Sequence, residues 1–104
     1  MSTYVLAYTG GAPAETPEAQ EASMKAWTEW FQGLGDSVVD AGNPFAASAT
    51  VASDGSVSEG GRGGLTGYSI ISADDLSAAS AQVKGCPILT DGGAVEVYEV
   101  FPVM

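Results

Sequence analysis

The sequence predicts one α+β domain spanning residues 1–104, with the element order βαββαβ. Residues 3–9 alternate in the period of two that is typical of a strand, and residues 17–34 repeat apolar side chains at helical spacing. Residues 65–83 then carry a strand pattern that runs directly into a helix start. These three observations favour a mixed fold whose strands and helices share one core.

The first predicted strand is residues 3–9. One face carries Tyr4, Leu6 and Tyr8, and the other carries Val5, Ala7 and Thr9. Both faces are largely apolar, so we expect a central strand that is covered on both sides.

The first predicted helix follows Thr16, which suits an N-cap, and Pro17, which suits the first helical position. It should end near Leu34, where Gly35 can terminate it. Its apolar stripe consists of Met24, Trp27, Phe31 and Leu34, with Trp30 on the flank. We interpret these aromatic residues as core beneath a sheet, and stacking against a ligand is the alternative.

A short second strand is predicted over residues 37–41, and Gly42-Asn43-Pro44 should bend or bulge the chain after it. Residues 46–52 are predicted to be extended. The pair Asp54-Gly55 then predicts a tight hairpin with residues 56–59 returning antiparallel. The glycine-rich stretch 59–64 is expected to be a mobile loop.

The next predicted strand is residues 65–72, and Ser72-x-x-Asp75 approximates a capping box ahead of the second helix. Gly85 is expected to end that helix, and residues 94–101 form the final strand. This order is that of the ferredoxin-like fold. It implies an antiparallel sheet with both helices on one face.

Charge and composition exclude several classes of partner. Three Lys and Arg residues stand against thirteen Asp and Glu residues, and the formal net charge is -10. Nucleic acid and anionic membrane surfaces would repel such a chain, so neither is expected as a partner. No apolar run approaches the length of a membrane span, and the N-terminus lacks a basic region, so we expect a cytoplasmic protein.

Metal and nucleophile chemistry also find little support. Cys86 is the only cysteine, which leaves no intrachain disulfide and no thiolate zinc site within one chain. The chain contains no His. We therefore expect no metal and no Ser-His-Asp system.

Several segments of the chain resemble one known family. These are YVLAY at 4–8, AWTEWF at 26–31, VDAGNPF at 39–45, GLTGYSII at 64–71, ADD at 73–75, CP at 86–87 and VEV at 95–97. Together they resemble the YCII-related family, also called DGPF-domain proteins, across nearly the whole chain. The resemblance implies a ferredoxin-like domain that pairs sheet to sheet into a dimeric α+β barrel, hence a homodimer.

Two features of that family are missing here. The segment Ser58-Glu59-Gly60-Gly61-Arg62-Gly63 stands where one branch has its DGPF motif, and the first helix lacks the His of another branch. Asp40 remains as a counterpart of the acid that pairs with that His. Related barrels include cofactor-free oxygenases, isomerases, lyases and heme enzymes. Heme held by the usual His ligand is set aside, so we expect no cofactor.

Candidate chemistry centres on Asp40, which follows a short strand and could act as a general base if it were desolvated in a cleft. Tyr8 and Tyr68 could point into the same cleft as phenolic donors, and Arg62 could close over a ligand. The alternatives are an exposed strand-end acid, tyrosines packed in the core and a solvated arginine. Further expected ligand contacts are Trp27, Phe31, Asn43 and Pro44.

Two hypotheses for function follow. The first is a homodimer that binds a small aromatic or apolar metabolite between sheet and helices, with cofactor-free lyase, isomerase or oxygenase chemistry. The second is a non-catalytic ligand-binding or protein-interaction module, because the chain lacks the His on which acid–base catalysis most often relies.

Overall fold

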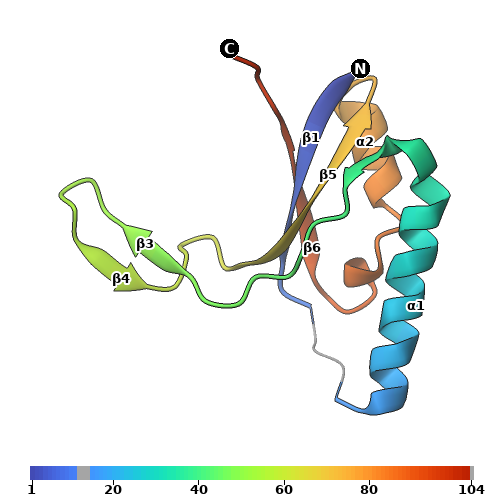
Figure 1. Ribbon diagram of the computed structural model, residues 1–104, viewed down its shortest axis with the longest axis horizontal. Coiled ribbons are helices and arrows are strands. Elements are labelled where there is room, and N and C mark those ends of the chain that lie inside the picture. The colour runs from blue at the N-terminus through green and yellow to red at the C-terminus, as the bar shows by residue number, and fades with distance from the viewer. Residues whose placement is uncertain (12–14, 104) are drawn as a thin grey trace.

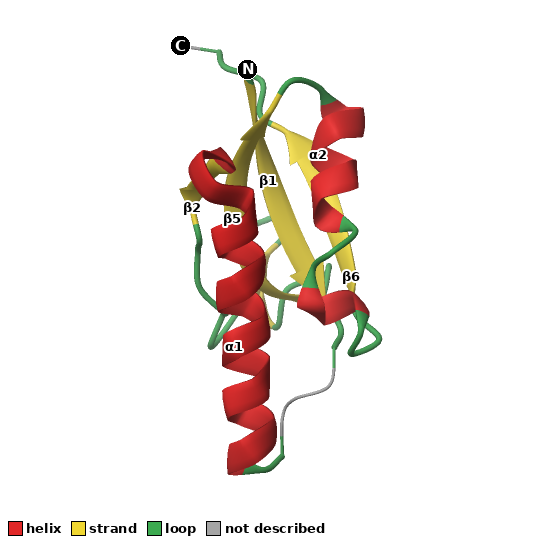
Figure 2. Cartoon of the chain, turned by 90° about the vertical axis from the view of Figure 1, so that its right-hand side faces the viewer, coloured by secondary structure: helices red, strands yellow, loops and turns green. Residues whose placement is uncertain are grey.

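The computed structural model describes residues 1–11 and 15–103. Within them, four strands form an antiparallel sheet in the order β2-β5-β1-β6. Figure 2 shows α1 and α2 against the same face of this sheet. The predicted ferredoxin-like α+β class is therefore confirmed. The elements of this layer are β1 Ser2–Thr9, α1 Pro17–Leu34, β2 Val38–Asp40, β5 Leu65–Ala73, α2 Leu76–Val83 and β6 Ala94–Glu99.

Strand β1 lies at the centre and pairs with β5 on one side and β6 on the other. Its side chains alternate as predicted. Tyr4, Leu6 and Tyr8 are buried in the core beneath the helices. Because β1 is hydrogen-bonded along both edges, it fixes the register of the whole sheet.

Helix α1 begins and ends where the sequence predicted. The hydroxyl of Thr16 accepts a hydrogen bond from the amide of Ala19 at 3.1 Å, which caps the first turn. Gly35 follows the last residue with φ of 58°, a left-handed conformation that favours glycine. No α1 side chain is fully buried, however, and Met24 is 71% exposed. The prediction that Met24 belongs to the packed stripe is therefore wrong.

Helix α2 starts differently from the prediction. Strand β5 continues to Ala73, and Ser72 lies inside it, with its hydroxyl directed at the carbonyl of Ser37. The cap is Asp75, whose carboxylate accepts a hydrogen bond from the amide of Ala78 at 2.8 Å. At the other end, Gly85 does not adopt a positive φ. The predicted capping box at Ser72 is therefore wrong, whereas α2 ends at Val83 with Lys84 as its C-cap, just before Gly85 as expected.

The turn after β2 keeps the chain beside β5. The amide of Tyr68 donates to the carbonyl of Asn43, and Pro44 forms an isolated bridge with Gly67. A Cβ on Gly42 would lie 1.8 Å from the carbonyl oxygen of Tyr68, and Gly42 has φ of 76°. The predicted bend is thus a close approach of two backbone segments that only glycine permits.

The predicted hairpin is a separate two-stranded sheet, β3 (Ala49–Val51) with β4 (Val57–Glu59). Figure 1 shows it extending away from the main sheet on the side opposite α1. Its base is closed by hydrogen bonds from the Gly60 amide to the Ser48 carbonyl and from the Thr50 hydroxyl to the Gly60 carbonyl. Mobility of the following glycines stays a prediction.

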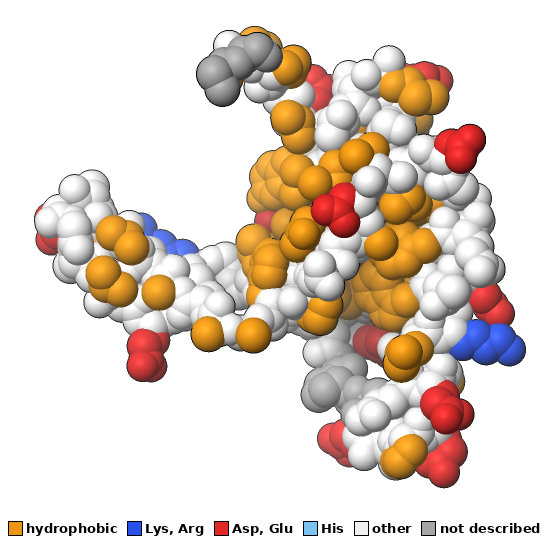
Figure 3. Space-filling model, viewed as in Figure 1, with side chains coloured by type: hydrophobic (Ala, Val, Ile, Leu, Met, Phe, Trp, Pro, Cys, Tyr) orange, Lys and Arg blue, Asp and Glu red, His pale blue; other side chains and the backbone are white. Residues whose placement is uncertain are grey.

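The sheet face opposite the helices, called here the open face, carries an apolar row beside polar residues such as Thr3 and Glu96. One row across three strands consists of Ile70, Val5 and Tyr98, and Tyr98 is 54% exposed. Figure 3 shows hydrophobic side chains gathered between the hairpin and the C-terminal segment. The final strand is shorter than the predicted 94–101, because β6 ends at Glu99, and its Val95 and Val97 pack on the core.

The chain exposes more surface than a compact monomer. Its accessible area is 7016 Å², whereas a monomer of this mass has about 5,400 Å². The radius of gyration is 15.1 Å, against about 13 Å for a compact chain of this length. None of the described helices is both long and apolar enough to cross a membrane.

We expect a second copy of the chain to cover the open face, so sedimentation velocity at micromolar concentration should give twice the 10.5 kDa chain mass. Tyr98→Lys places a charge on the exposed apolar row of that face and should shift the protein toward monomer. Ala81→Lys adds the same charge at an exposed position of α2, on the other side of the sheet, and should leave the dimer intact. A wild-type monomer would contradict this expectation.

Gly42→Ala should strongly destabilise the fold, by about 3 kcal/mol or more, because the new methyl group overlaps the Tyr68 carbonyl and the backbone needs a positive φ. The matched control is Gly33→Ala in α1, where a Cβ meets nothing within 4 Å. That change should stabilise the protein by about 0.5–1 kcal/mol. Urea unfolding of both variants measures the difference, and equal effects would refute the assigned close approach.

Candidate functional site

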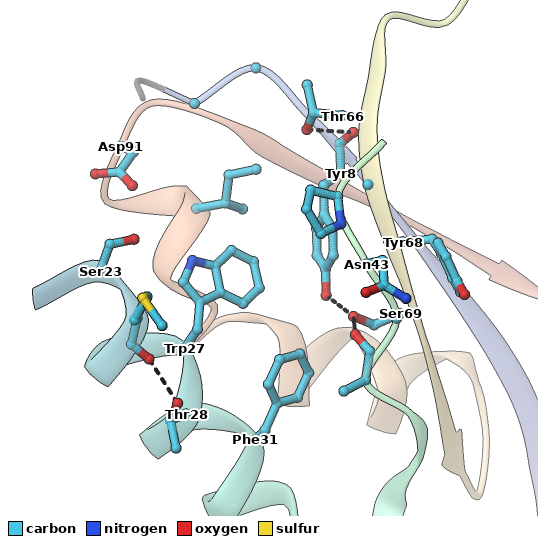
Figure 4. Close-up of a pocket in the computed structure, with 18 residues that line it drawn as sticks. Tyr8, Ser23, Trp27, Thr28, Phe31, Asn43, Thr66, Tyr68, Ser69 and Asp91 are labelled. Atoms are coloured by element: carbon cyan, nitrogen blue, oxygen red, sulfur yellow. Dashed lines mark hydrogen bonds between the residues drawn. The ribbon is translucent and has the colours of Figure 1, made fainter. Parts of the chain in front are cut away.

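A cleft of about 740 Å³ lies between α1 and the sheet. Helix α1 contributes Trp27 and Phe31, β1 contributes Tyr8, and the turn after β2 contributes Asn43 and Pro44. Figure 4 shows the rings of Trp27, Phe31 and Tyr8 directed toward one another across this space. The lining is predominantly apolar, with a small number of polar groups, as in small-molecule sites.

The cleft exists because aromatic side chains hold α1 away from the sheet. The rings of Tyr8 and Trp27 meet edge to face with centroids 5.2 Å apart. About one turn further along the helix, the indole nitrogen of Trp30 donates to the carbonyl of Gln82 at 3.2 Å, and its ring lies beside Gly85. Two bulky side chains therefore set the spacing between helix and sheet.

The inner end of the cleft contains a short chain of buried hydrogen bonds. The hydroxyl of Tyr8 donates to the hydroxyl of Ser69 at 2.6 Å, and Ser69 donates to the carbonyl of Ala41 at 2.6 Å. Ser69 is fully buried, and Tyr8 is nearly so. Burial raises the pKa of Tyr8 to about 12, against the opposing effect of its hydrogen bond with Ser69, so Tyr8 stays protonated near neutral pH.

Tyr68 does not share the cleft in the way the sequence suggested. Its ring lies on the open face, where it stacks on Phe45 with centroids 5.7 Å apart and an angle of 18° between the planes. Figure 4 shows its side chain directed away from Tyr8 and Trp27. Residue 68 borders the cleft because its neighbours in the chain, Gly67 and Ser69, line it. The phenol of Tyr68 points the other way, so the prediction of a Tyr68 donor in the cleft is wrong.

Asp40 and Arg62 lie outside the lining of the cleft. The carboxylate of Asp40 is exposed and accepts a hydrogen bond from the amide of Gly42 at 2.8 Å, a turn that the acid itself closes. Arg62 is exposed and follows the hairpin, which projects away from α1. The expected desolvation of Asp40 is therefore wrong, and Arg62 does not line the cleft.

The full chain, residues 1–104, matches the family model of the YCII-related domain. The chain belongs to the YCII-related family. No curated protein and no solved structure shows a significant match to it.

In this YCII-related chain, the structure brings six of the eight sequence-predicted residues to the border of one cleft. Their roles in binding or catalysis stay predictions. The six are Tyr8, Trp27, Phe31, Asn43, Pro44 and Tyr68.

Sequence reasoning missed Ser69 and Ile88, which also line the cleft. The available signal for Ser69 was the alternation along residues 65–73, which places Gly67, Ser69 and Ile71 on one face. Which of the two faces meets the helices depends on the pairing with β1, where Leu6 lies opposite Ser69. Ile88 lies in the short 3₁₀ turn Pro87–Leu89, which has no periodic pattern.

Cys86 is buried in the core, and burial raises the pKa of its thiol to about 11. It is therefore a poor nucleophile near neutral pH. In the part of the chain that the structure describes, no group of three or more His, Cys, Asp or Glu residues is arranged to hold a metal ion.

The YCII-related protein should lose stability at alkaline pH. Burial raises the pKa of Cys86 from 9.0 to about 11 and that of Tyr8 from 10.0 to about 12, so the unfolded chain loses these protons first. The stabilisation is fully present below pH 9.0 and is lost as pH rises toward about 12. Urea unfolding across this pH range should show a falling free energy of unfolding. Cys86→Ala should remove the part of the fall that begins at the lower pH. A flat profile in the wild type would contradict this origin.

Proposed function

We propose that this YCII-related protein binds a compact aromatic or otherwise apolar small molecule in the cleft between α1 and the sheet. One observation carries the proposal: a cleft of about 740 Å³ whose walls are aromatic and aliphatic. That volume lies within the range of small-molecule sites, about 300–1,000 Å³. The rings of Trp27 and Phe31 lie at 5.9 Å between centroids and supply broad apolar surfaces for such a ligand.

The half-burial of α1 supports the same proposal. Trp27, Phe31 and Leu34 are neither sealed in the core nor fully exposed, so a ligand can remove more of their apolar surface from water. Stacking of a ligand on these aromatics, the alternative to a role in the core alone, is part of this proposal. Trp30 and Leu34 pack against the core cluster, while Phe31 faces the cleft.

A cofactor-free lyase, isomerase or oxygenase has less support as the function. Its proposed base, Asp40, has an exposed carboxylate that is hydrogen-bonded to the Gly42 amide. The high pKa of Tyr8 makes its hydroxyl a weak acid and leaves little phenolate at neutral pH. The observations therefore favour a non-catalytic binding module. The homodimer and the cytoplasmic location belong to the same proposal as expectations.

The neutral dye N-phenyl-1-naphthylamine tests the proposal, because its fluorescence rises in an apolar site. We expect saturable binding, and we expect Trp27→Ala to weaken it about tenfold or more, since the substitution removes a wall of the cleft. Gln32→Ala, an exposed change on the same helix, should leave the affinity unchanged. Circular dichroism confirms that both variants fold. Equal affinity in the wild type and Trp27→Ala would place the dye elsewhere and count against the cleft.

Asp40→Asn is the second control. Because the Asp40 carboxylate lies outside the lining, dye affinity should stay within about twofold of the wild type. Turnover of a substrate found later, reduced by about 10²–10⁴ in this variant, would instead support the catalytic alternative.

A further inference from the structure

The hydrogen-bond chain at the inner end of the cleft has a fixed direction. The carbonyl of Ala41 can only accept, so the Ser69 hydroxyl must donate its single proton to it. Ser69 then accepts from Tyr8, whose own proton is committed to that bond. Figure 4 shows this chain running from Tyr8 through Ser69 on the sheet side of the cleft.

The direction of the chain determines what Tyr8 offers to a ligand. A tyrosine hydroxyl has one proton and lone pairs that can accept, and here only the lone pairs remain. A ligand group that approaches the Tyr8 oxygen must therefore donate a hydrogen bond. An ether or carbonyl at that position would place two acceptors against each other without a proton between them, and burying such groups is unfavourable.

Charges around the cleft disfavour anions. Among the described residues that line it there is no Lys, Arg or His, and the one acidic residue is Asp91. The whole chain carries a formal net charge of -10. A carboxylate or phosphate ligand would lose its water without gaining a cationic partner.

The remaining polar groups do not change this conclusion. The indole nitrogen of Trp27 has no hydrogen-bond acceptor among the described residues, and Figure 4 shows it on the side of Ser23 and Asp91, away from the Tyr8 hydroxyl. Asn43 carries both donors and an acceptor, so it does not discriminate. The selective group at the inner end is the Tyr8 oxygen.

We propose that the ligand class of this cleft is a compact aromatic molecule that carries an N–H or O–H donor at its buried end and bears no negative charge. This inference rests on the proposed binding function and adds to it the polarity of the ligand. The donor binds the Tyr8 oxygen, while the ring lies against the side chains of Trp27 and Phe31 that line the cleft.

Indole and benzofuran provide a matched test, because they share a shape and differ in an N–H donor against an oxygen acceptor. Titration of both into the wild-type protein, followed by ligand-observed NMR, should give an affinity for indole that is about five- to tenfold higher. Equal affinity, or a preference for benzofuran, would overturn the donor requirement while the binding function stands. Absence of binding by both at millimolar concentration would overturn the binding function as well.

Two substitutions assign the preference to the hydrogen-bond chain. Tyr8→Phe removes the acceptor, so indole and benzofuran should bind with affinities within about twofold of each other. Ser69→Ala frees the Tyr8 proton, so benzofuran should gain affinity relative to indole. Either variant is sufficient if the other fails to fold. An unchanged indole preference in a folded variant would refute the role of Tyr8.

A second pair tests the charge requirement. Indole-3-acetamide and indole-3-acetate have nearly the same shape, and the neutral amide should bind about tenfold more tightly or better. Asp91→Asn should reduce the difference in affinity between the amide and the acetate. Asp74→Asn makes the same charge change outside the cleft and should leave that difference unchanged. Equal binding of amide and acetate in the wild type would overturn the exclusion of anions.

Discussion

The alternation of side chains along β1 is the constraint on which the rest of this structure depends. Because β1 is paired on both edges, each of its residues has a fixed neighbour on β5 and on β6. Tyr4, Leu6 and Tyr8 build the core, and the same register places Tyr8 beside Ser69 at the inner end of the cleft. A slip of one residue would exchange the two faces and abolish core and cleft together.

The cleft is a consequence of how α1 is attached. Tyr8, Trp27 and Trp30 form a connected set of edge-to-face contacts that keep the helix near the sheet without sealing the space beside it. In a closely packed pair of layers, smaller side chains would let the helix approach and fill this volume. Tyr8 and Trp27 therefore both stabilise the fold and line the candidate site, whereas Trp30 serves the packing alone.

Local signals in the sequence were sufficient for helix α1, because a cap or a terminating glycine acts within one turn, but they misplaced the start of α2, where Ser72 lies inside β5. Thr16, Pro17 and Gly35 bound α1 as predicted. Signals that depend on a partner segment were not sufficient. Whether Tyr68 or Ser69 faces the helices is decided by pairing with β1, and the exposure of Asp40 follows from its own turn with Gly42. The aromatic walls of the cleft could be predicted from helical periodicity, whereas its polar end could not.

The hairpin β3–β4 has a separate consequence for how the chain tolerates change. Its strands pair over a short sequence separation, from Ala49↔Glu59 to Val51↔Val57, and Ser48 and Gly60 close its base. Such a unit contributes only local contacts, so it can form without waiting for the distant strands of the main sheet to meet. Its tip at Asp54 and Gly55 is exposed and distant from the core. A peptide tag or an added loop inserted there would leave the register of β1 untouched.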